Sequence, residues 1–199
     1  MIYRHALLPG SYDPVTKGHL SLVKRAALFC EKVSACVFVN PAKSCLFSIE
    51  ERKSFLALAC ESIPNASAHF HLGMEPEFAE MHGCDIIIKG VRDEKDLAYE
   101  KKIVTDWAKE NGVDYLLMVG DTSENGALTV KERYEIKGTV NEAFTMAQGV
   151  PPMLLLAAQK GLADVSSTAV RKALAQGENL CELIVPQTVS LIKEAYANK

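Results

Sequence analysis

The residues best placed to do chemistry lie between positions 7 and 20, where an apolar run ends at Pro9-Gly10 and a polar loop leads into an amphipathic segment. This pattern predicts a strand, a tight turn and a helix. Helix N-termini carry unpaired N–H groups and a partial positive charge, so such a junction suits a phosphate group. Ser11 adds a hydroxyl, and His19 falls in the first helical turn. Ordinary strand-to-helix turns contain such residues too, so this stretch indicates a phosphate site without establishing one.

Further basic residues follow other apolar runs. Lys43 comes shortly after the run Val33–Val39, and Lys89 and Arg92 follow a later run. Continuous apolar runs of this length are typical of strands buried on both faces of a parallel sheet. The carboxyl ends of such strands meet at one edge, where ligands bind. Together with a helix start expected at Ser166-Ser167-Thr168, these cations predict a polyphosphate site.

The elements that must position these residues alternate between strands and helices, which predicts an α/β fold with a doubly wound parallel sheet. After the first strand, strands are expected at Val33–Val39, Ala68–Leu72, Cys84–Lys89, Tyr115–Val119 and Met153–Ala158. Helices are expected at Lys17–Phe29, Ile49–Ser62, Glu77–His82, Asp96–Asn111, after Ser166, and at Pro186–Ala197. Ser48 and Glu51 match a capping box for the second helix. The segment between Val119 and Met153 has no clear assignment.

Composition limits the classes of function. The 199 residues suit one domain, residues 1–199, and 48% hydrophobic residues allow a full core. A net charge of −3 argues against broad nucleic-acid binding. No apolar run approaches the roughly 20 residues of a membrane span. The first residues lead straight into a strand, so we expect no signal peptide, no membrane partner and a cytoplasmic location.

Cysteine and histidine spacing gives little sign of a metal site. The six cysteines show no C-x-x-C spacing, so we interpret them as reduced, mostly buried thiols. His69 and His71 alternate across Phe70 and share one face of a strand, but a metal site there would need a third ligand from elsewhere. A solvated or edge face is the preferred interpretation of the two histidines.

Several motifs resemble the nucleotidylyltransferase superfamily. The turn after the first strand, ending in Thr16-Lys17-Gly18-His19, resembles its (T/H)-x-G-H signature, and Thr16 points to the phosphopantetheine adenylyltransferase branch. Four later blocks are similar to that branch in the same order: Asn40 to Arg52, Lys89-Gly90-Val91-Arg92, Asp96 to Glu100, and Val165 to Arg171. The resemblance covers about residues 3–110 and 152–196.

The resemblance implies a Rossmann-like fold and transfer of AMP from MgATP to 4′-phosphopantetheine, giving dephospho-coenzyme A and pyrophosphate. It implies His19 as the catalytic residue and an acceptor site of Ser11, Lys43, Glu75 and Lys89. It implies an ATP site of Ser11, Tyr12, His19, Gly90, Val91, Arg92, Glu100, Leu162, Ala163, Asp164, Val165, Ser166, Ser167 and Thr168. Mg²⁺ is expected on the nucleotide phosphates and water, with no protein ligand. Coenzyme A is implied as an inhibitor, and a hexamer as the homo-oligomer.

The chain departs from that pattern at several positions. Ser11 stands where threonine is usual, Tyr12 where phenylalanine is usual, and Lys89 replaces an arginine. Glu75 occupies an acceptor-contact position that is usually apolar or small. Roughly 40 residues at about 112–151 form an insertion without any motif of the cleft, so we expect it to be peripheral.

Two alternatives stay open at this point. One is another nucleotidylyltransferase, such as one acting on nicotinate or nicotinamide mononucleotide, although those enzymes usually show H-x-G-H where this chain has Thr16. The other is a catalytically silent relative that binds a nucleotide but releases no pyrophosphate.

Overall fold

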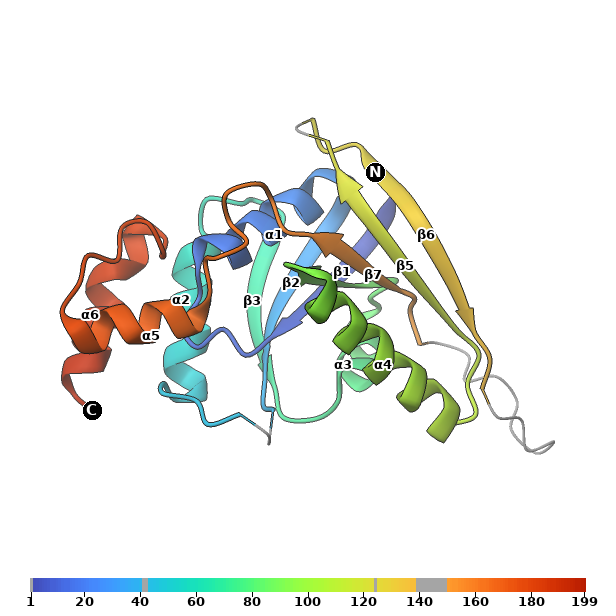
Figure 1. The fold of residues 1–199 in the computed structure, drawn as a ribbon, viewed down its shortest axis with the longest axis horizontal. Helices are drawn as coiled ribbons and strands as arrows, with labels where there is room; N and C mark the ends of the chain where they lie inside the picture. The colour runs from blue at the N-terminus through green and yellow to red at the C-terminus, as the bar shows by residue number, and fades with distance from the viewer. Residues whose placement is uncertain (1, 41–42, 124, 139–149) are drawn as a thin grey trace.

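A seven-stranded sheet with helices on both faces forms the centre of the molecule (Figure 1). The computed structural model describes residues 2–40, 43–123, 125–138 and 150–199. The strands are β1 (Tyr3–Gly10), β2 (Cys30–Phe38), β3 (Ala66–His71), β4 (Ile86–Val91), β5 (Tyr115–Thr122), β6 (Leu128–Ile136) and β7 (Met153–Ala157). Their order across the sheet is β3-β2-β1-β4-β7-β5-β6, and only the β5–β6 pair is antiparallel.

The helices cover the two faces of the sheet and bury two separate hydrophobic clusters. They are α1 (Lys17–Phe29), α2 (Ile49–Cys60), α3 (Glu75–His82), α4 (Glu94–Glu110), α5 (Ser167–Gln176) and α6 (Val189–Ala197), with a 3₁₀ turn at Pro186–Thr188. Helices α1, α2, α5 and α6 share one cluster with Leu8 and Ile88, whereas α3 and α4 share the other with Leu7 and Ile87. Neighbouring strand residues therefore point to opposite faces, as period-two geometry requires. The prediction of a doubly wound sheet is confirmed.

Helix boundaries follow local capping chemistry. The predicted capping box is present, because the Ser48 hydroxyl accepts from the Glu51 N–H and the Glu51 carboxylate accepts from the Ser48 N–H. Helix α4 begins before the predicted Asp96, because the Asp93 carboxylate caps it by accepting a 2.8 Å hydrogen bond from the Asp96 N–H. Helix α3 likewise begins at Glu75, two residues before the predicted start.

The insertion contributes the β5–β6 hairpin at one edge of the sheet (Figure 1). Strand β5 is largely buried between β7 and β6, whereas β6 is an edge strand with a half-exposed, charged sequence. Lys101 of α4 donates a 2.6 Å hydrogen bond to the Tyr134 hydroxyl on β6. The remainder of the insertion, residues 139–149, lies outside the described residues.

The remaining expectations from composition concern thiols, metals and membranes. All six cysteines are free thiols, and four are buried. Burial raises the pKa of the Cys30 and Cys36 thiols to about 12, which keeps them protonated. Within the described ranges, no three or more His, Cys, Asp or Glu side chains come together as a possible metal site. His69 and His71 therefore have no third ligand among the described residues. No described helix has both the length and the apolar character needed to span a bilayer.

Candidate active site

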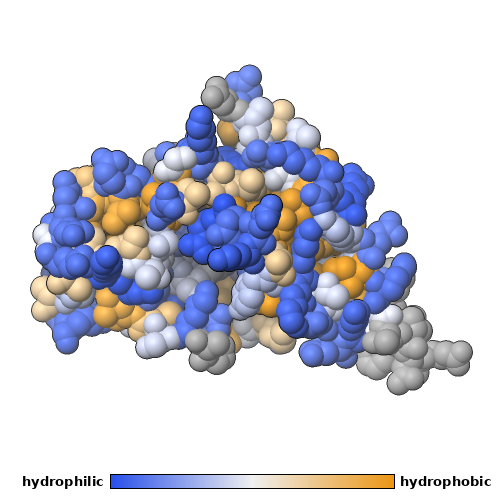
Figure 2. Space-filling model, viewed as in Figure 1, coloured by the Kyte–Doolittle hydropathy of each residue, from blue (hydrophilic) through white to orange (hydrophobic). Residues whose placement is uncertain are grey.

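A cavity of about 1110 Å³ opens at the carboxyl ends of β1, β2, β4 and β7. Figure 2 shows this face hollowed near its centre, with hydrophilic and hydrophobic side chains intermingled around the hollow. Strand β1 lies between β2 and β4, whose connections run to opposite faces, so the cavity sits where ligands bind in open α/β sheets. The lining includes all four residues of the predicted acceptor site: Ser11, Lys43, Glu75 and Lys89.

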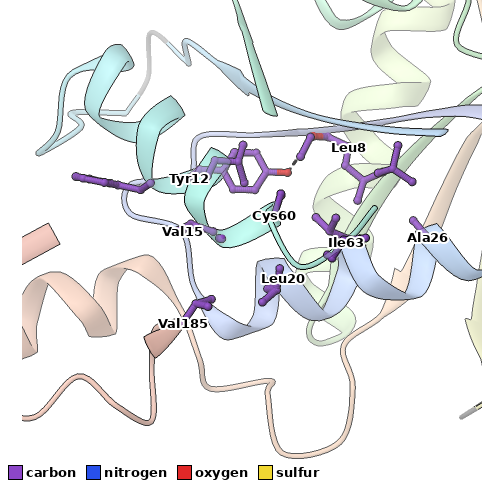
Figure 3. Packing of buried hydrophobic residues seen from close by; sticks show 14 of the residues in the cluster. Leu8, Tyr12, Val15, Leu20, Ala26, Cys60, Ile63 and Val185 are labelled. Carbon is purple, nitrogen blue, oxygen red and sulfur yellow. Dashed lines mark hydrogen bonds between the residues drawn. The ribbon is translucent and has the colours of Figure 1, made fainter. Parts of the chain in front are cut away.

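The turn between β1 and α1 is held in place by Tyr12. The backbone of Tyr12 is in the left-handed region, with φ at 47°. Its ring is 3% exposed, and its hydroxyl donates a 2.9 Å hydrogen bond to the Leu8 carbonyl (Figure 3). A Cβ atom on Gly10 would lie only 2.9 Å from this ring, so the close approach requires glycine. Tyr12 thus shapes the turn, leaving Ser11 at the cavity surface.

His19 presents an uncharged hydrogen-bond donor to the cavity. Its Nδ1 accepts a 3.1 Å hydrogen bond from the Thr16 N–H, so the proton of the neutral ring is on Nε2. Burial, with Arg92 and Lys43 nearby, lowers the pKa of His19 to about 4. The ring stays neutral at physiological pH and can donate from Nε2 without adding charge. An edge-to-face contact with the Tyr12 ring, with 4.9 Å between the ring centroids, also orients the His19 ring.

Two helix N-termini face the same cavity. Thr16 caps α1 and Ser166 caps α5, and both residues line the cavity. The Ser167 hydroxyl donates a 2.8 Å hydrogen bond to the Pro14 carbonyl, which holds the two helix starts together. A Cβ on Gly18 would come within 3.3 Å of the Val165 carbonyl oxygen, so glycine permits this close packing. The pairing directs the positive ends of two helix dipoles at the cavity, an arrangement that favours negative charge there.

Asp13 is a positioning residue that the sequence patterns did not reveal. Its buried carboxylate accepts 2.9 Å hydrogen bonds from the Leu46 and Phe47 N–H groups. Arg171 of α5 donates to the Asp13 carbonyl at 2.6 Å and to its carboxylate at 3.1 Å. Three segments that surround the cavity are thus tied to one side chain. Only the position of Asp13 inside the first motif could have indicated this role.

Most of the predicted ATP-site residues line the cavity, but three do not. Those that line it are Ser11, Tyr12, His19, Gly90, Arg92, Glu100, Leu162, Val165, Ser166, Ser167 and Thr168. Val91 is 6% exposed and belongs to the hydrophobic cluster under α3 and α4. Ala163 and Asp164 are outside the lining, although the loop that carries them borders the cavity.

The cations of the cavity differ in how they are paired. Arg92 makes a two-pronged contact with Asp96, with distances of 2.6 and 3.0 Å. Lys89 lies between Glu75 at 2.9 Å and Glu100 at 3.3 Å. Lys43 has no ion pair with any residue in the described part of the chain. Arg92 and Asp96 are only four residues apart, whereas the contacts of Lys89 with Glu75 and Glu100 form only on folding, so sequence spacing could not reveal them.

Comparison with known proteins places the chain in a family. A family model described as cytidylyltransferase-like matches residues 7–173. The chain belongs to the cytidylyltransferase-like family. A protein of Caldanaerobacter subterraneus subsp. tengcongensis named phosphopantetheine adenylyltransferase is 35% identical over 142 residues, which cover 70% of this chain and 89% of the relative. A Staphylococcus carnosus protein of the same name is 31% identical over 140 residues, or 69% and 87% of the two chains.

A further relative matches over a shorter region. The phosphopantetheine adenylyltransferase of Symbiobacterium thermophilum is 44% identical over 95 residues, and the match covers 48% of this chain and 59% of the relative. The names of these relatives confirm the resemblance drawn from the motifs.

Proposed function

We propose that this chain transfers AMP from MgATP to 4′-phosphopantetheine, giving dephospho-coenzyme A and pyrophosphate. The main support is the convergence on one cavity of two helix N-termini, the neutral His19 and Lys43, which has no ion pair among the described residues. This set suits two phosphate-bearing substrates. The names of the relatives supply the substrate pair. We also propose that the chain forms a hexamer, is inhibited by coenzyme A and works in the cytoplasm.

The proposed reaction needs no general base, because the attacking oxygen of the acceptor's phosphate is already anionic at neutral pH. That oxygen forms a bond to the α-phosphorus of ATP, and the bond between this phosphorus and the leaving pyrophosphate oxygen breaks. The Nε2–H of His19 would donate to the α-phosphate as negative charge builds there. Lys43 would hold the acceptor's phosphate in line for attack.

The donor set of the cavity fits a Mg²⁺ ion held mainly by the nucleotide. Asp96 already bonds Arg92 and Glu100 already contacts Lys89. No three-ligand cluster occurs among residues 2–40, 43–123, 125–138 and 150–199. When bound, the ion would offset the charge of the ATP phosphates and of the departing pyrophosphate.

An acceptor screen tests the proposal. Pyrophosphate release is measured with ATP, Mg²⁺ and either 4′-phosphopantetheine, nicotinate mononucleotide or nicotinamide mononucleotide. We expect clear preference for phosphopantetheine. Preference for a mononucleotide would instead assign the chain to another branch of nucleotidylyltransferases. If the chain binds ATP but releases no pyrophosphate with any of the three acceptors, it is a catalytically silent relative.

A further inference from the structure

The ammonium group of Lys89 is enclosed by two carboxylates in the part of the cavity proposed to bind the acceptor. Its Nζ lies 2.9 Å from Glu75 Oε1 and 3.3 Å from Glu100 Oε2, and the Lys89 side chain is 17% exposed. All three side chains line the cavity. Burial lowers the pKa of Lys89, but the two carboxylates outweigh that effect and the pKa is raised overall. Lys89 is therefore fully charged, and its charge is already matched.

The group as a whole is not a good phosphate site. One ammonium and two carboxylates sum to a net charge of −1, whereas phosphate binding needs positive charge. An ammonium has three donors, and the two carboxylates engage two of them. Glu75 is the first residue of α3, where the helix N-terminus stabilises negative charge and fixes the backbone. Glu75 is thus a rigidly based carboxylate at the place where a phosphate would approach Lys89.

We infer that Glu75 is a specificity-determining residue of the acceptor site, which competes with the acceptor's phosphate for Lys89 and weakens binding of phosphate-bearing acceptors. This inference rests on the proposed function. It leaves Lys43 as the principal cation for the acceptor's phosphate. The contact of Glu75 with Lys89 is shorter than that of Glu100, so Glu75 is the stronger competitor.

The test replaces the competing charge and keeps the shape. Glu75→Gln should lower KM for 4′-phosphopantetheine about tenfold, which corresponds to about 1.4 kcal/mol, and leave KM for ATP unchanged. Binding of unphosphorylated pantetheine should not change, because it has no phosphate to compete. The matched control is Glu80→Gln, which removes the same charge from an exposed position of α3 outside the cavity lining and should alter none of these values.

Inorganic phosphate as a probe separates this inference from the proposed function. Its affinity, measured by thermal shift, should rise about tenfold in Glu75→Gln, and Lys89→Met in that background should abolish the gain. Unchanged or weaker phosphate binding in Glu75→Gln would overturn the inference, as would equal gains for phosphopantetheine and pantetheine. Tighter phosphate binding without turnover of phosphopantetheine by either protein would reject the proposed function and keep the inference.

Discussion

At the scale of single residues, His19 is the group that the proposed chemistry depends on most. Its Nδ1 is occupied by the Thr16 N–H, so only Nε2–H can act on a substrate. A donor that acts on charge developing in the transition state affects turnover more than binding, and losing one typically lowers kcat by about 10²–10³. We expect His19→Ala to lose turnover on this scale while ATP affinity, measured by calorimetry, stays within a few-fold. Near-wild-type turnover would show that His19 is structural.

The depressed pKa of His19 also predicts a pH dependence of stability. The folded-state pKa of about 4 lies below the ordinary value of 6.5 in the unfolded chain. Between these values the unfolded state binds the extra proton, so stability falls as pH falls from 6.5 toward 4. His19→Gln should reduce this loss, measured as the unfolding free energy in urea at pH 7 and pH 4.5. Parallel pH profiles for the two proteins would contradict the assigned environment.

Lys89 gives a third prediction at this scale. Removing the ammonium eliminates its remaining donor and leaves Glu75 and Glu100 unmatched beside the acceptor. A charge-assisted contact contributes about 1.5–3 kcal/mol, so Lys89→Ala should weaken acceptor use by roughly 10–100-fold. KM for ATP should change much less, and Lys89→Arg should be tolerated. A selective rise in KM for ATP would mean that Lys89 serves the nucleotide, not the acceptor.

At the scale of elements, the β5–β6 hairpin is more closely joined to the sheet than the sequence indicates. Leu117, Met118 and Val119 of β5 are buried. Arg25 of α1 donates to Asp121 at 2.9 Å and to Thr122 at 2.6 Å, and it also lines the cavity. The insertion therefore supports one wall of the cavity, although it provides no predicted site residue.

Excision of the insertion tests this arrangement. β5 is parallel to β7, and parallel neighbours need a crossover connection, so removal of residues 120–150 alone could not leave β5 in place. The excision should remove residues 112–151 and join α4 to β7. We expect a lower unfolding free energy or changed assembly, with turnover largely kept in the folded fraction. A stable variant with unchanged assembly but no turnover would place the insertion over the active site.

The sequence was informative where local patterns decide structure. Apolar runs and capping residues predicted the parallel strands and most helix boundaries, because burial and capping act over a few residues. Strand β6 could not be assigned, since an edge strand need not be apolar on either face. The links of Asp13 to Arg171 and of Lys89 to Glu75 depend on tertiary packing, which spacing along the chain does not encode.

At the scale of the whole molecule, one cavity collects residues from both halves of the sheet. The first turn supplies Ser11 and His19, the loop after β2 supplies Lys43, and the start of α5 supplies a second helix N-terminus. The fold thus gathers, at one edge, donors and charges suited to two phosphate-bearing substrates. We propose that these groups serve adenylyl transfer to 4′-phosphopantetheine.

Product identification by mass spectrometry, with pyrophosphate measured in the same reaction, tests that claim most directly. The wild-type chain with ATP, Mg²⁺ and 4′-phosphopantetheine should form dephospho-coenzyme A and pyrophosphate in equal amounts, and neither should form when ATP or the acceptor is omitted. Lys43→Ala is expected to slow both products in step, because it removes the cation proposed to hold the acceptor's phosphate. Absence of dephospho-coenzyme A, with an adenylylated mononucleotide formed instead when that acceptor is supplied, would contradict the account.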